Sequence, residues 1–85
     1  MAKEKEIGKI THYFGKIKVG IIELTSVLKV GDKIHIKGNA TDFEQGVASM
    51  QIEHEEIPEG KAGDSIGIKV NDQVREGDLV FLVIE

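Results

Sequence analysis

The sequence contains no cysteine and no tryptophan, a single proline, and aromatic residues at only 5% of its 85 positions. Without cysteine there can be no disulfide bond and no thiolate metal site. No apolar run approaches the roughly 18 residues that a membrane-spanning helix needs. The charged opening run, MAKEKE, has no apolar segment suited to secretion. We therefore expect a cytoplasmic protein with no membrane contact.

The length predicts one domain, because domains typically run to about 50–250 residues. A chain of this size hides only about 60–65% of its unfolded surface, which leaves little room for a deep catalytic cleft. Hydrophobic residues make up 40% of the sequence, too high a share for a disordered chain. We expect residues 1–6 to form a flexible N-terminus and residues 7–85 to form the domain.

The net charge of −4 hides an asymmetry along the chain. Residues 1–38 carry eight lysines and four acidic residues, a balance of +4, whereas residues 39–85 carry three basic and eleven acidic residues, a balance of −8. This split is typical of a soluble sheet with cross-strand ion pairs, and it also suits a basic face for phosphates opposite an acidic one. A domain that is acidic overall binds nucleic acid only weakly by electrostatics alone.

Apolar and polar residues alternate along most of the chain, and no segment keeps a helical period over about 11 residues. This pattern predicts an all-β protein whose strands close, or nearly close, into a barrel. Pro58 cannot donate a ladder hydrogen bond and breaks the pattern after residue 52. The phase change between Phe43 and Met50 predicts a bulge at Gly46. The expected strands are 7–14, 17–24, 33–37, 41–52, 65–70 and 79–84.

Gly-Asp occurs three times, at residues 31–32, 63–64 and 77–78, each time just before an expected strand. Glycine allows a positive φ, and the aspartate carboxylate can accept hydrogen bonds from nearby backbone amides, so each pair predicts a tight turn. Within the strands, we expect isoleucines 34 and 36 to point inward, and we expect the run at residues 79–84 to be buried on both faces. Core positions are also expected for the phenylalanines, Phe14, Phe43 and Phe81.

Two stretches resemble the second domain of translational GTPases such as elongation factor Tu and initiation factor two. The first is LKVGDKIHIKG at residues 28–38, and the second is EGKAGDSIGI at residues 59–68, preceded by Ser49-Met50. Arg75-Glu-Gly-Asp resembles the last turn of that domain. The resemblance covers residues 7 to 84, and it extends to small stand-alone elongation-factor-like proteins and to the C-terminal module of some collagenase-type peptidases.

The resemblance implies a closed six-stranded antiparallel Greek-key barrel of the kind that contacts tRNA or ribosomal RNA in the GTPases. The phosphate loop G-x-x-x-x-G-K-[ST] is absent, so we expect no GTPase activity and no bound nucleoside triphosphate. Ser49 replaces the acidic residue found there in aminoacyl-tRNA carriers, and two extra residues separate Met50 from Gly60. These two departures leave open whether a pocket for an aminoacylated adenosine is retained.

Lysines on two expected strands form the main candidate site for RNA or for another partner. Lysine supplies charge for phosphates without base specificity, and a tyrosine could stack on a base. The same residues also fit the solvated face of a half-buried sheet. The candidate contact residues are Tyr13, Lys16, Lys18, Lys33, His35 and Lys37.

Neither metal binding nor catalysis is predicted. The spacing of His12, His35 and His54 fits no local ligand motif, and in Glu53-His54-Glu55-Glu56 neighbouring side chains of a strand point to opposite faces. Three serines lie in no nucleophile motif: Ser26, Ser49 and Ser65. We expect no cofactor and no enzymatic activity.

The sequence thus favours a non-enzymatic, translation-factor-like binding module that contacts tRNA or the ribosome through its lysine-rich first half. The alternative is a protein-interaction or accessory module that docks on a larger enzyme or factor.

Overall fold

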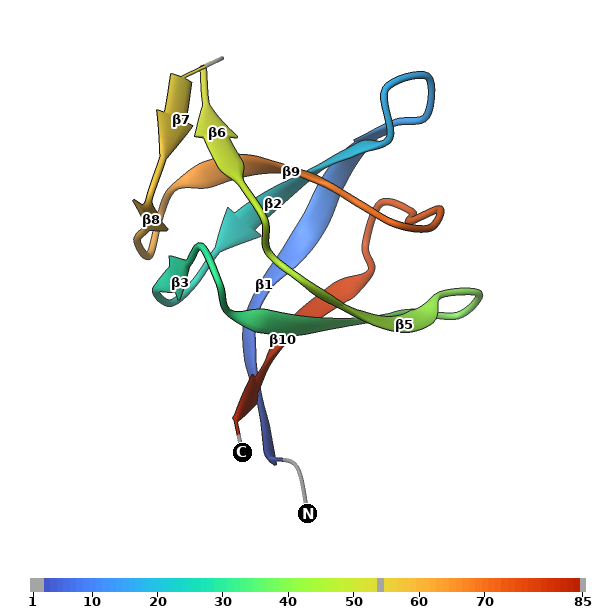
Figure 1. The fold of residues 1–85 in the computed structure, drawn as a ribbon. Helices are drawn as coiled ribbons and strands as arrows, with labels where there is room; N and C mark the ends of the chain where they lie inside the picture. Colours follow the sequence, from blue (N-terminus) through green and yellow to red (C-terminus); the bar gives the residue numbers. More distant parts are fainter. Residues whose placement is uncertain (1–2, 54, 85) are drawn as a thin grey trace.

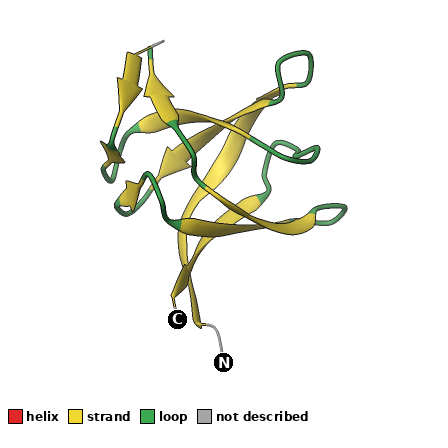
Figure 2. Ribbon diagram, viewed as in Figure 1, coloured by secondary structure: helices red, strands yellow, loops and turns green. Residues whose placement is uncertain are grey.

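The computed structural model describes residues 3–53 and 55–84, and within them every regular element is a β-strand (Figures 1 and 2). No helix in this described part is long and apolar enough to cross a membrane. The strands are β1 (Lys3–Phe14), β2 (Val19–Leu24), β3 (Leu28–Lys29), β4 (Lys33–Lys37), β5 (Asp42–Gly46), β6 (Met50–Ile52), β7 (Glu55–Ile57), β8 (Glu59–Gly60), β9 (Ser65–Lys69) and β10 (Leu79–Ile84).

Eight of these strands form one antiparallel sheet in the order β5-β4-β10-β1-β2-β9-β6-β7, and β3 pairs with β8 in a small second sheet. The long strand β1 lies near the middle, with β10 on one side and β2 on the other (Figure 1). The all-β, antiparallel prediction is confirmed. Lys3 pairs with Ile84, so the first strand begins four residues before the predicted start at Ile7. The mobility expected for residues 1–6 stays a prediction.

The sheet order has two ends, β5 and β7, and no ladder joins them in the described residues, so the predicted closed barrel is not found. The predicted strand 41–52 is divided. β5 pairs with β4 in unbroken register up to Gly46, which excludes a bulge there. The chain then leaves β4, and Val47 exchanges backbone hydrogen bonds of 2.8 Å with Gly31 and Asp32 before β6 joins β9. The change of phase is therefore a change of partner strand.

The buried apolar residues form one hydrophobic core, and it includes the predicted Ile34 and Ile36. β-branched residues dominate it, as expected for side chains packed on pleated strands. Fully burying each such side chain contributes about 1.5–3 kcal/mol. The buried apolar residues are Ile7, Ile10, Ile22, Leu24, Leu28, Ile34, Ile36, Val47, Met50, Ile66, Ile68, Val70, Val74 and Val80.

The core positions predicted for Phe14 and Phe81 are wrong, whereas Phe43 packs against the core. The register of β1 against β2 shifts between Ile10 and His12. This bulge turns Phe14 outward, where it is 50% exposed, and brings Tyr13 against the core instead. Phe81 lies on the outer face of β10, because Val80 takes the inward position. The burial predicted for both faces of the run 79–84 is therefore wrong: Val80 is its one buried residue, and Leu79 and Ile84 are exposed.

The three Gly-Asp turns are confirmed, and they share one geometry. The glycines have φ of 98°, 92° and 91°, a region that L side chains rarely adopt. In each turn the amide of the residue three positions before the aspartate donates to the aspartate carboxylate, at 2.9–3.0 Å. The aspartate amide donates back to the carbonyl of that same residue. Each turn thus closes with a reciprocal pair of hydrogen bonds that begins at Lys29, Lys61 or Arg75.

Candidate binding groove

An apolar groove of about 420 Å³ lies on the outer face of the sheet, over β1, β2, β9 and β6. Apolar side chains line it together with a few polar groups, which is the usual composition of a binding site. The lining residues, hereafter the groove, are His12, Phe14, Ile17, Val19, Ile21, Gln51, Glu53, Ser65 and Gly67.

The β1 bulge creates one wall of this groove. Because it reverses the phase of the strand, His12 and Phe14 both point outward, and their rings stack with centroids 6.4 Å apart and planes 11° apart. The turn at residues 15–18 follows, in which the amide of Ile17 donates to the carbonyl of Phe14 at 3.3 Å. Ile17 is 61% exposed. An aromatic and a branched aliphatic side chain are thus held open to solvent at the end of one hairpin.

Gly67 forms the floor. It pairs with Ile21 on β2 and with Gln51 on β6. A Cβ added here would lie 3.4 Å from the side chains of Val19 and Ile21. The missing side chain therefore leaves the space that the groove occupies, and any longer side chain at this position would fill it.

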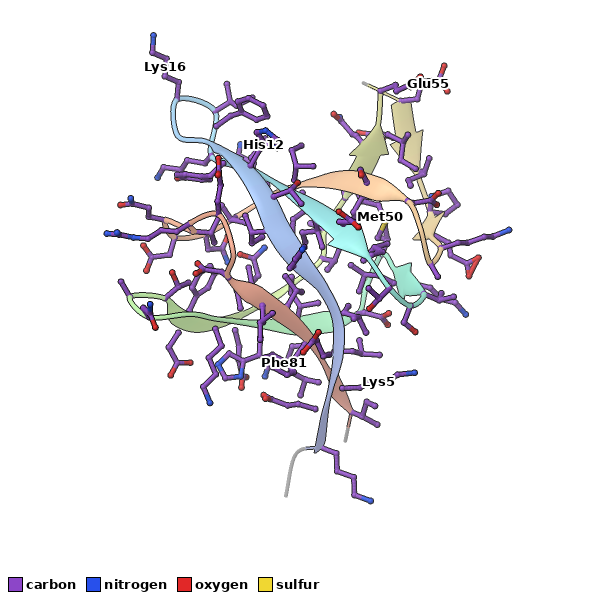
Figure 3. All side chains as sticks on the ribbon, turned by 180° about the vertical axis from the view of Figure 1, so that it is seen from behind. Lys5, His12, Lys16, Met50, Glu55 and Phe81 are labelled. Atoms are coloured by element: carbon purple, nitrogen blue, oxygen red, sulfur yellow. The ribbon has the colours of Figure 1, made fainter. Side chains whose placement is uncertain are left out.

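The structure divides the six predicted contact residues into two groups. Lys16 and Lys18 lie in the turn between β1 and β2, beside the groove, and Lys16 points away from the body of the protein (Figure 3). Tyr13, on the same hairpin, packs against the core. The other three lie on the outer-facing positions of β4: Lys33, His35 and Lys37. Two strands, β10 and β1, separate β4 from β2 in the sheet, so the two groups do not form one patch.

Carboxylates surround the β4 group. Lys33 Nζ lies 3.0 Å from Glu44 Oε1, and His35 Nδ1 lies 2.6 Å from Glu4 Oε2. His35 Nε2 forms a short hydrogen bond with Asp42. This bond raises the pKa of His35 against the opposing effect of burial, and it lowers the pKa of Asp42. Charges of both signs thus lie on this face, which weakens its attraction for phosphates; its contact with RNA stays a prediction.

The histidines do not form a common set in the described residues: His12 lies in the groove and His35 on β4, whereas His54 lies outside the described residues. Sequence reasoning missed the three carboxylates around His35. Glu4 is 31 positions away in the chain, and only the strand order brings it there. Glu44 could have been found, because it is the direct partner of His35 across the β4–β5 hairpin.

No protein-family model matches this chain. The chain is 44% identical over 81 residues to an uncharacterised protease of Methanocaldococcus jannaschii, an alignment that covers 94% of this chain and 20% of the protease. It is also 39% identical to elongation factor 1-alpha of Methanothrix thermoacetophila and 40% identical to that of Thermococcus sibiricus. Each of these matches covers 76% of this chain and 16% or 17% of the factor. The chain spans a fifth or less of the length of these relatives.

Two solved structures of one domain share the fold. They are crystal structures of the C-terminal domain of a Geobacillus thermoleovorans protein described as a U32 peptidase. One aligns with a TM-score of 0.87 over 92% of this chain and 91% of that domain, and its selenomethionine variant aligns with a TM-score of 0.85. Sequence identity is 14%, so the likeness shows the fold alone.

Proposed function

We propose that this chain is a non-catalytic accessory domain that docks on a larger enzyme through the groove. The observation that carries this proposal is the pattern of coverage. Nearly the whole chain aligns with one fifth of a protease, and the fold matches a C-terminal domain almost end to end. A unit of this size and fold therefore occurs as a part attached to larger proteins.

The exposed apolar side chains of the groove support docking. Aromatic side chains at the centre of an interface carry much of its binding energy. Phe14 is 50% exposed and Ile17 is 61% exposed. Full burial of such a side chain contributes about 1.5–3 kcal/mol, so covering the part of each that is still exposed would contribute roughly 1–2 kcal/mol. The polar residues of the groove include Gln51 and Glu53, which suit the polar rim of a protein interface.

The polar groups of the groove give no support for catalysis. A serine nucleophile needs a base within hydrogen-bond reach. In the described part of the chain, no hydrogen bond joins Ser65 to His12, the histidine of the same groove. The groove is also open to solvent along the sheet, whereas catalytic sites commonly exclude water.

A second candidate function is RNA binding, favoured by the likeness to elongation factor 1-alpha over 76% of the chain. In this case the hairpin lysines, Lys16 and Lys18, would follow a phosphate backbone beside the groove.

Affinity purification from the native cell tests both candidates. The bait is the full chain, compared with Phe14→Asp/Ile17→Asp and with Val27→Asp, a control at an exposed apolar residue outside the groove. We expect one larger enzyme to co-purify after nuclease treatment, to be retained by the control and to be lost with the double variant. If the chain instead captures RNA in a salt-sensitive way, and Lys16→Glu/Lys18→Glu abolishes this capture, RNA binding and not docking is the function.

A further inference from the structure

The outer face of β4 holds a group of metal-ligating side chains away from the groove. His35 is the central residue of β4, and its side chain is only 13% exposed. Glu44 faces it from β5 as its direct cross-strand partner. Glu4 approaches from β1, with Oε2 2.6 Å from His35 Nδ1. One ligand atom from each of these three residues lies within 4.8 Å of the others.

We propose that Glu4, His35 and Glu44 bind a divalent transition-metal cation such as Zn²⁺, with Asp42 holding the His35 ring in place. This site is independent of the proposed docking function, because none of its residues lines the groove.

The separations suit an ion after a small side-chain movement. Zinc lies about 2.0–2.2 Å from histidine nitrogen and carboxylate oxygen, so two of its ligand atoms are at most about 4.4 Å apart. The three ligand atoms lie within 4.8 Å of one another, and Glu4 Oε2 and His35 Nδ1, now 2.6 Å apart, must separate slightly to admit an ion. Binding therefore needs a small movement of the carboxylates. The glutamates can supply it, because their side chains are 29% and 42% exposed, whereas His35 is held more tightly between its neighbours.

Asp42 fixes which nitrogen of His35 faces the ion. Its carboxylate accepts a hydrogen bond from Nε2. Without an ion, Nδ1 donates to the Glu4 carboxylate; an ion would take the place of this proton, and Nδ1 would then offer its lone pair. Metal-ligating histidines almost always donate their other ring N–H in this way, and the carboxylate partner orients the ring. The arrangement thus has three ligands and one orienting group.

The donor set favours a transition metal over magnesium or calcium. Imidazole suits zinc, copper, iron and nickel, whereas magnesium and calcium prefer sites built from oxygen alone. Three protein ligands leave the fourth tetrahedral position open to water. Lys33 competes for the ion's place, because its Nζ lies 3.0 Å from Glu44 Oε1. Exposed ion pairs of this kind are weak, so an incoming cation can displace the lysine from Glu44.

A bound ion would join β1 to the β4–β5 hairpin across β10. Glu4 belongs to the part of β1 that pairs only with β10, beyond the reach of β2. The metal would therefore link the first residues of β1 directly to the β4–β5 hairpin. Without the metal, β10 is the strand that connects the two.

Calorimetric titration of the tag-free full chain with Zn²⁺ tests the site. We expect one equivalent to bind, His35→Ala and Glu4→Gln/Glu44→Gln to abolish binding, and Asp42→Asn to weaken it about 10–100-fold. His12→Ala is the matched control, because it removes a histidine from the groove, and it should bind like the parent chain. Far-UV circular dichroism confirms that each variant is folded.

Two results would overturn the proposal: no uptake of Zn²⁺ at micromolar concentration, or equal losses with His12→Ala and His35→Ala. A second measurement needs no variant, so it tests the site even if a variant fails to fold. In the unsubstituted chain, ¹⁵N spectra of the imidazoles should show Zn²⁺ shifting Nδ1 of His35 while the His12 nitrogens stay in place. A shift confined to His12, or a response to Mg²⁺ equal to that to Zn²⁺, would also contradict the assigned site.

Discussion

The replacement of Gly8 by alanine tests the packing at the middle of the sheet. Gly8 pairs with Leu24 on β2 and with Val80 on β10. An added Cβ would lie 2.6 Å from the backbone oxygen of Glu23 and 2.9 Å from Ile22 Cγ2. The first contact is with backbone on a strand that β9 holds from its other side. Neither strand can therefore move aside without breaking hydrogen bonds.

The expected loss follows from this clash. Overpacking of a tight interior costs about 1–3 kcal/mol, and a backbone contact places this site at the upper end. Alanine also lowers the conformational entropy of the unfolded chain, which offsets about 0.4–1 kcal/mol of this cost. The net loss of about 2 kcal/mol should lower the melting temperature by roughly 8–16 °C.

Urea unfolding followed by circular dichroism measures this loss, and Gly46→Ala is the matched control. Nothing lies within 4 Å of a Cβ added at Gly46, and its φ is not positive. The control should therefore change the free energy of unfolding by no more than about 0.5 kcal/mol. Equal unfolding midpoints for the two variants would refute the described placement of β1 between β10 and β2.

Two further predictions concern polar side chains. Gln45 is buried, donates to the Lys69 carbonyl at 2.9 Å and accepts from the Asn71 amide at 2.8 Å. Gln45→Leu should cost about 1–3 kcal/mol in urea unfolding, since it leaves both groups unpaired; an unchanged midpoint would contradict this role. The hydrogen bond to Asp42 raises the pKa of His35 above its ordinary value, so the stability it contributes is complete below pH of about 6.5. That contribution is lost as pH rises through the raised pKa. With a chelator present, the difference in free energy of unfolding between the parent chain and His35→Gln should therefore shrink toward alkaline pH. A difference that stays constant with pH would exclude the ion pair.

Local chemistry made much of the fold predictable. The alternation of polar and apolar residues from Lys33 to Lys37 predicted both the strand and its inward-facing isoleucines, because one face of that strand is buried and the other is not. The Gly-Asp pairs gave the turns, because a positive φ and a reciprocal carboxylate–amide hydrogen bond depend only on neighbouring residues. Such features need no knowledge of the partner strand.

The missed features depend on strand pairing. The bulge after Ile10 is a shift in the register of β1 against β2, just beyond the last β1 residue that pairs with β10. This bulge decides that Phe14 faces solvent. Gly46 suggested a bulge, but the chain there changes partner strand. The group around His35 comes from the order β5-β4-β10-β1, which the spacing of histidines along the chain does not contain.

The central claim is that the groove of β1, β2, β9 and β6 is the docking surface. The most direct measurement is an NMR titration of the ¹⁵N-labelled chain with the enzyme that it captures. The largest amide changes should fall at residues 12–21 and 65–67, and Gly67→Leu, which fills the groove floor, should abolish them. Changes confined to β4 and β5, or binding that Gly67→Leu leaves intact, would contradict the claim.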